Sequence, residues 1–231
     1  NDFARLNKAH ALCDAAEFNV ALNELDQVSQ HERETGTYYW ILLGWALENL
    51  GRDRTEEALR AYDYCVSRDP EDIYSRRGRA DMYRRLRKAD RAAEDYEWLI
   101  RRADSKAETA VPDLLAMKGW SMYGLGRPED GVKFLVDALS LDPSLISSQF
   151  DLGLIFLCCG RAAVALREYQ RGIDLTNGKT PARRKGLLSV AVRDLRDALA
   201  DRPELERVRQ VRRIREMLLS ALRPRELAAT Q

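Results

Sequence analysis

A spacing of glycines, large apolar residues and turn residues recurs in the middle of this chain with a period of 34 residues. The recurring positions pair as follows: Gly119 with Gly153, Met122 with Phe156, Gly126 with Gly160, and Pro143 with Asn177. A fixed period of this size indicates supersecondary units that stack on one another, each burying the apolar face of its neighbour. Such a stack displays an extended concave surface, and this surface typically serves binding.

One period reads as two helices joined by a tight turn. Apolar and small residues recur with helical spacing from Leu114 to Leu125, Gly126 then ends the helix, and Pro128 suits the first position of the next one. The second helix ends at Asp142 and Pro143. The unit is therefore predicted to be an antiparallel helix hairpin.

Further copies of the unit precede this one. Trp40, Leu43, Gly44 and Gly51 repeat the first helix, followed by a turn at 52–55 that is longer than in the other copies. The next copy has Ala80 and Arg87 where the others have glycine, and the N-terminal copy, with Ala9, Leu12, Ala21, Leu25 and Val28 in register, has no Gly or Pro at these positions.

This spacing resembles that of the tetratricopeptide repeat (TPR) family over about residues 2–178, with five repeats. The resemblance implies an all-α fold: a right-handed superhelical solenoid of antiparallel helix hairpins with C-terminal capping helices. We expect the solenoid at 1–178, a capping helix pair at 179–223 and a frayed tail at 224–231. Within the capping pair, Thr180 and Pro181 are predicted to open one helix, and Arg202 and Pro203 another.

The resemblance also implies where a ligand would bind, because in this family the first helix of each hairpin lines the concave groove. A peptide or partner protein is the expected ligand, since aromatic and Arg side chains dominate binding hot spots. For any single ring, the alternative is that it fills the seam between neighbouring helices. The groove positions are Tyr38, Ile41, Trp45, Tyr74, Arg77, Asp81, Arg84, Trp120, Tyr123, Phe150 and Leu154.

Some TPR proteins hold the C-terminal carboxylate of chaperones with Lys and Asn at set groove positions. Where Asn would be wanted, this chain has Trp45, Asp81, Trp120 and Leu154. Chaperone-tail binding is therefore not expected.

Composition limits the other function classes. We expect no enzyme activity, cofactor or metal, because the chain has only two histidines, no metal-ligand spacing and no Gly-rich phosphate loop. No apolar run reaches the roughly 18–20 residues of a membrane span. We expect the four cysteines to be reduced core thiols and the chain to be cytoplasmic. Because residue 1 is Asn, we read the sequence as a piece of a longer chain, which leaves room for a targeting segment before it.

Charge distribution raises two alternatives. Residues 161–231 carry 17 Lys and Arg against 9 Asp and Glu, whereas residues 1–160 carry 21 against 28. A basic C-terminal segment permits a nucleic-acid-binding helical repeat, although nucleic acid is not the favoured partner. The other alternative is a homo-oligomer that pairs through the apolar face of the last helix, formed by Val208, Val211, Ile214 and Leu218.

Overall fold

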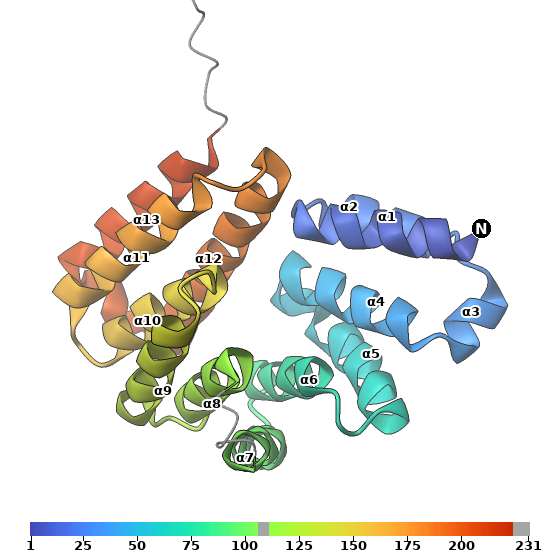
Figure 1. Cartoon of the computed structure of the whole chain (residues 1–231), viewed down its shortest axis with the longest axis horizontal. Coiled ribbons are helices and arrows are strands. Elements are labelled where there is room, and N and C mark those ends of the chain that lie inside the picture. The colour runs from blue at the N-terminus through green and yellow to red at the C-terminus, as the bar shows by residue number, and fades with distance from the viewer. Residues whose placement is uncertain (106–110, 224–231) are drawn as a thin grey trace, which may run out of the picture.

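The computed structural model describes residues 1–105 and 111–223, and within these ranges the regular secondary structure is helical throughout (Figure 1). The tail expected at 224–231 lies outside the described residues. The elements are α1 Asp2–Asp14, α2 Phe18–Leu25, α3 Gln30–Thr35, α4 Thr37–Leu50, η1 Arg52–Arg54, α5 Thr55–Arg68, α6 Ile73–Arg85, α7 Ala89–Asp104, α8 Pro112–Gly124, α9 Pro128–Leu141, α10 Ile146–Cys158, α11 Ala162–Thr176, α12 Pro181–Asp201, η3 Pro203–Arg207 and α13 Arg209–Leu222.

The 34-residue period of the sequence is the period of the helices. α8 starts at Pro112 and α10 at Ile146, 34 residues later, and α9 and α11 start at Pro128 and Ala162, also 34 apart. Consecutive helices pack as antiparallel pairs, as the contacts of α4 with α5, α8 with α9 and α10 with α11 show. The predicted all-α, TPR-like hairpin fold is confirmed.

The small residues of the pattern lie where helices approach most closely. The ring of Tyr62 on α5 lies between Gly44 on α4 and Gly78 on α6. A Cβ added at these two glycines would lie 2.9 and 2.4 Å from the ring. The large residue therefore fills the space that the small ones leave, which is why the repeat pattern alternates in size.

The turns between helices use the left-handed backbone region. Gly126 and Gly160 have φ of +76° and +73°, as expected for glycines that end helices. Arg87, predicted to replace glycine at this position, has φ of +60°, and Ala16 in the first repeat has φ of +56°. These two residues accept a conformation that costs a side chain with Cβ about 1–2 kcal/mol.

Three short segments between the main helices can be compared with the sequence prediction: α3, η1 and η3. The longer turn expected at 52–55 is present as η1, but the short helix α3 was not predicted. The helix expected to open at Arg202 and Pro203 is instead the 3-10 helix η3, and α13 starts only at Arg209. Buried Leu205 anchors η3 in the core, and the extended backbone of Val208 separates it from α13.

The apolar face of α13 is used inside the chain. Val211, Ile214 and Leu218 are buried in the same core cluster as the residues of α11 and α12, against which α13 packs. The idea that this face stands free to pair with a second copy is therefore wrong. The face is buried because α11, as the last repeat helix, has an apolar stripe of its own that α13 covers.

The repeats curve so that the last helices return to the first ones. In Figure 1 the chain runs from α1 and α2 through α7 at the bottom to α11 and α13, and α12 lies on the inner side of this curve. α12 contacts α10, α11 and α13, and it also contacts α1. The concave face therefore holds a helix of the same chain.

Candidate partner-binding site

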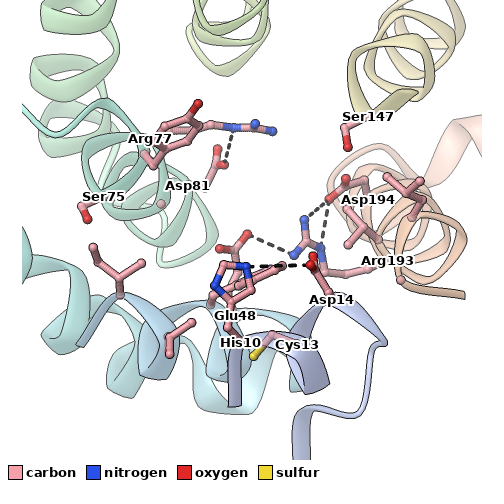
Figure 2. A pocket seen from close by; sticks show the side chains of 18 of the residues that line it. His10, Cys13, Asp14, Glu48, Ser75, Arg77, Asp81, Ser147, Arg193 and Asp194 are labelled. Atoms are coloured by element: carbon pink, nitrogen blue, oxygen red, sulfur yellow. Dashed lines mark hydrogen bonds and ion pairs between the residues drawn. The ribbon is translucent and has the colours of Figure 1, made fainter. Parts of the chain in front are cut away.

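A cavity of about 620 Å³ lies on the concave side, between the first three repeats, α10 and α12 (Figure 2). Its wall comes from α1, α4 and α6 on one side and from α10 and α12 on the other. Its volume falls within the range of about 300–1,000 Å³ that small-molecule and side-chain pockets occupy.

The structure brings most of the predicted groove residues to this cavity. Tyr38 and Tyr74 are 37% and 58% exposed, so the cavity can be reached from solvent on their side. The predicted positions in its lining are Tyr38, Ile41, Trp45, Tyr74, Arg77, Asp81 and Phe150.

Four predicted groove residues do not line the cavity. Trp120, Tyr123 and Leu154 are buried in the core cluster that also contains the apolar residues of α12. Arg84 contacts Asp201 of α12 at 2.8 Å. α12 covers the C-terminal half of the concave face. The four side chains there therefore pack against neighbouring helices or form ion pairs within the chain.

The polar centre of the cavity is formed by Arg77 and two carboxylates. Arg77 lies 3.8 Å from both Asp81 and Asp151, and its guanidinium stacks over the Trp120 ring with the Cζ atom 4.7 Å from the ring centre. Asp81 also accepts hydrogen bonds from Trp120 Nε1, at 3.0 Å, and from the hydroxyl of Tyr96. Asp81 therefore has several close donors, whereas Asp151 meets Arg77 only at the longer distance of an ion pair.

Two groups at this centre, Asp151 and Arg77, have shifted pKa values. Burial, against the lowering effect of Arg77 and with the added effect of the nearby Asp194 and Asp81 carboxylates, raises the pKa of Asp151 to about 7. For Arg77, burial opposes the charge, but Asp151 and Asp81 outweigh it and raise the pKa of the guanidinium. Asp151 is therefore a group of the cavity that titrates near neutral pH.

A second charged group joins α4 to α12. Arg193 lies 3.1 Å from Glu48 and donates to Asp194 at 2.7 Å, and the hydroxyl of Tyr62 donates to Glu48 at 2.7 Å. In Figure 2, Arg193 and Asp194 lie on the opposite side of the cavity from Arg77 and Asp81, and Glu48 lies between the two sides. The acidic and basic members of this second group are paired with each other, so they fix the wall rather than leaving a free charge.

The rim near α1 is aromatic and charged. His10 contacts the Tyr38 hydroxyl through Nδ1, and its ring lies edge-on to Trp45 with the centres 5.8 Å apart. At the same rim, Asp14 pairs with Arg183 of α12.

Sequence reasoning missed the cavity residues that come from α1 and α12. His10 and Asp14 belong to the least regular repeat, and Arg183, Arg193 and Asp194 were assigned to a terminal cap. The sequence signal that could have found them is weak: on α12, Arg193 and Asp197 lie among the apolar residues of the predicted capping helix, and the structure buries both.

The arginines of α6 belong to a network of ion pairs. Arg79 contacts Asp95 at 2.7 Å and Asp63 at 3.3 Å, and Arg76 contacts Asp95 at 3.0 Å. Arg85 reaches Asp197 on α12 at 2.8 Å. These arginines are thus paired within the chain. Among the described residues, no cluster of three or more His, Cys, Asp or Glu is arranged to hold a metal ion.

No protein-family model matches the chain, and no curated protein matches it by sequence. Solved structures with a similar fold include TTC0263, a thermophilic TPR protein in Thermus thermophilus, with 20% identity, a TM-score of 0.49, and coverage of 81% of this chain and 99% of that one. MamA 41-end from Desulfovibrio magneticus RS-1 has 17% identity, a TM-score of 0.46, and coverage of 77% and 96%. MamA AMB-1 has 18% identity, a TM-score of 0.44, and coverage of 75% and 98%.

At these identities and TM-scores the similarity says nothing about what this chain binds. The TPR-like fold rests on the helix period and the packing of this chain itself. No helix in the described ranges is long and apolar enough to cross a membrane.

Proposed function

We propose that this chain is a non-catalytic protein-interaction scaffold that binds a peptide segment of a partner protein at the central cavity. The observation that carries the proposal is the convergence of predicted groove residues from three repeats, among them Tyr38, Trp45, Tyr74 and Arg77, on one solvent-accessible cavity of about 620 Å³. Partly exposed rings beside an Arg are the typical composition of a hot spot.

The chemistry of the cavity favours a segment with an aromatic or aliphatic anchor. The rings of Trp45 and Tyr74 offer apolar contact at the wall, while the charged groups at its centre pair mainly with one another. An apolar anchor gains contact area without breaking those pairs, whereas an unpaired charged ligand would disturb them. Four free cysteines support a reducing compartment, and we propose the cytoplasm as the location.

Site-specific photo-crosslinking tests the proposal. A photoreactive phenylalanine analogue at Tyr74 is expected to capture a defined partner segment, and Trp45→Ala is expected to abolish that capture while the helical circular dichroism remains. The matched control is the analogue at Phe3, which is 71% exposed and lies away from the cavity.

Two outcomes would contradict cavity binding. One is equal capture from Tyr74 and Phe3, and the other is capture from Tyr74 that Trp45→Ala leaves unchanged. Nuclease treatment before cross-linking separates a protein partner from one held through nucleic acid.

A further inference from the structure

The carboxylates that line the central cavity differ in their supply of hydrogen-bond donors. Glu48 accepts a hydrogen bond from the Tyr62 hydroxyl at 2.7 Å, and Asp81 accepts one from Trp120 Nε1 at 3.0 Å. In the described part of the chain, no residue donates a hydrogen bond to the Asp151 carboxylate. The Asp151 side chain is nevertheless only 8% exposed, and it lines the cavity. A buried carboxylate in this state favours a cationic ligand.

Asp151 depends on one cation, and it shares that cation. Nη2 of Arg77 lies 3.8 Å from Asp151, and Nε of the same guanidinium lies 3.8 Å from Asp81. Stacking on the Trp120 ring holds the guanidinium in this intermediate position. One cation therefore serves two carboxylates, and neither contact reaches hydrogen-bond distance.

The charged groups at the centre of the cavity carry an excess of negative charge. They come from α4, α6, α10 and α12, and they are Glu48, Arg77, Asp81, Asp151, Arg193 and Asp194. Carboxylates thus outnumber guanidinium groups. Two further guanidinium groups approach from outside the lining: Arg84 lies 4.0 Å from Asp81, and Arg85 lies 3.9 Å from Glu48. Neither of them pairs with Asp151, so the missing positive charge is at α10.

A second acceptor belongs to the same wall. α10 and α12 pack against each other, and the Asp194 carboxylate of α12 acts electrostatically on Asp151. Both hydrogen bonds from Arg193 end on Oδ1 of Asp194, which leaves Oδ2 as an acceptor in the cavity wall. A small cation at this wall can therefore contact two carboxylates at once.

The occupant that fits this wall is a primary ammonium group. A metal ion is not favoured, because no three His, Cys, Asp or Glu side chains of the described ranges are arranged to hold one. An ammonium group is a compact charge with three donors, enough for two carboxylates. On a lysine, the methylene stem can also lie along the partly exposed rings of Tyr38 and Tyr74 at the cavity entrance.

We propose that the cavity binds a lysine side chain of the partner segment, with its ammonium group on Asp151 and Asp194 and its stem along the aromatic entrance. This inference rests on the proposed function, and it adds one charged contact beside the apolar anchor. The ammonium group breaks no hydrogen bond at Asp151, because that carboxylate accepts none within the described chain. A charge placed among the other, paired groups would not have this advantage.

A proton competes with the ammonium group for Asp151. Burial raises the pKa of this carboxyl to about 7, so at pH 6 it must release a proton before it can pair. Binding of a lysine should therefore strengthen by about tenfold from pH 5.5 to pH 7.5 and then level off. Tyr169 of α11 does not contribute, because burial raises its pKa well above its ordinary value of 10. His10 at the rim is retained in Asp151→Asn, so a flat profile in that variant assigns the effect to Asp151.

Two capped tripeptides are the probes, and the full chain is the receptor. One is acetyl-Leu-Lys-Leu-amide, and the other has norleucine in place of lysine, which keeps the stem and removes the ammonium group. By isothermal titration calorimetry at pH 7.5, we expect the lysine probe to bind the wild-type chain at least about tenfold more tightly than the norleucine probe. In Asp151→Asn this preference should disappear, and the pH dependence should disappear with it.

Two further variants accompany Asp151→Asn. Asp194→Asn removes the second acceptor, and we expect it to reduce the preference for lysine by at least about threefold, which tests the site independently of whether Asp151→Asn folds. The matched control is Asp137→Asn, an exposed position on α9 outside the cavity lining, which should keep the wild-type preference. Circular dichroism shows which variants are folded.

Three results overturn the inference. They are equal affinity or no measurable binding of the two probes, a preference for lysine that Asp151→Asn leaves unchanged, and equally tight binding of free n-butylammonium, which would assign the site to a free amine. The proposed function is tested separately. A segment captured through Tyr74 that tolerates replacement of all its lysines by norleucine would overturn this inference alone. Absence of capture would contradict the proposed function, while the probe comparison still measures the preference of the cavity for an ammonium group.

Discussion

At the scale of single residues, burial changes the chemistry of the ionisable groups more than sequence suggests. Asp151 lies in the cavity wall on α10, 3.8 Å from Arg77 and within the electrostatic influence of the Asp81 and Asp194 carboxylates. Cys13 lies in the same wall on α1 and is 1% exposed. The repeat pattern does not predict the environment of either residue, because it specifies which positions pack together and does not specify which charged side chains come into contact.

The raised pKa of Asp151 predicts a pH-dependent loss of stability. Its folded pKa is about 7, against an ordinary value of 3.8. Between these values the folded chain holds a proton that the unfolded chain has released, so the free energy of unfolding falls as pH rises through this window. Asp151→Asn removes this penalty, and we expect its advantage over wild type to grow from pH 4 to pH 8 by as much as about 4 kcal/mol.

Urea unfolding of the two chains at a series of pH values measures this difference. The comparison is internally controlled, because near pH 4 the wild-type carboxyl is largely protonated in the folded chain and there resembles the amide. A difference that stays constant over the whole series would show that Asp151 ionises normally.

Cys13 is predicted to be inert in the folded chain. Burial raises its pKa to about 12 from an ordinary value of 9, and the thiolate is the reactive form. At pH 8, alkylation by iodoacetamide should therefore be slower by about a thousandfold on account of ionisation alone. Peptide mapping after alkylation checks this, with the urea-unfolded chain as the reference. Equal labelling of Cys13 in both states would mean that α1 opens readily.

At the scale of helices and turns, size alternation and backbone conformation decide the structure. Tyr62 between Gly44 and Gly78 shows the alternation, and Gly126 and Gly160 show the turns. Where the sequence departs from the pattern, the backbone keeps the same conformation: Arg87 has the positive φ of the glycines that it replaces. Packing of the flanking helices therefore imposes the turn, whichever residue occupies it.

Ala16 provides the matching stability prediction. Its φ of +56° is unfavourable for a residue with Cβ, so Ala16→Gly should stabilise the chain by about 0.5–1 kcal/mol. Gly126→Ala is the reverse experiment at an equivalent turn, where a Cβ would meet nothing within 4 Å, so only backbone strain changes. We expect it to destabilise by about 1 kcal/mol. Midpoints of urea unfolding give both values, and shifts of the same sign would refute the backbone explanation.

At the scale of the whole molecule, α12 decides the shape of the concave face. Its apolar side completes the core of the C-terminal repeats, and its charged side meets the first three repeats. Because one helix contacts both the C-terminal repeats and the first repeats, it closes one side of the concave face and so forms a wall of the cavity. Residues more than 140 positions apart, such as Arg52 and Asp197, lie in contact as a result.

The unequal character of the two sides predicts unequal stability effects. Leu188 is fully buried, and Leu188→Ala should cost about 2–5 kcal/mol by leaving a void in the main core. Arg183→Gln removes a half-exposed pair with Asp14 and should cost less than about 1 kcal/mol. Thermal unfolding of the two variants beside wild type tests this, and similar costs for both would show that the ion pairs hold α12 as firmly as the core does.

The sequence by itself determined the helix hairpins, their 34-residue period and the turns that join them. These features depend on residues within one or two repeats of each other, so a local pattern of small, large and turn residues records them. The TPR resemblance implied which helices line the concave face, and seven of the eleven groove residues that it implied reach the cavity.

Only the tertiary structure decided that α12 lies on the concave face and that Trp120, Tyr123 and Leu154 are buried there. This outcome depends on the total curvature of the stack, which sums small rotations over all the repeats, and on ion pairs such as Arg193 with Glu48. The sequence around a charged residue in one repeat does not indicate which distant charged residue it will pair with. The chain therefore encodes its hairpins locally and the closure of its concave face only globally.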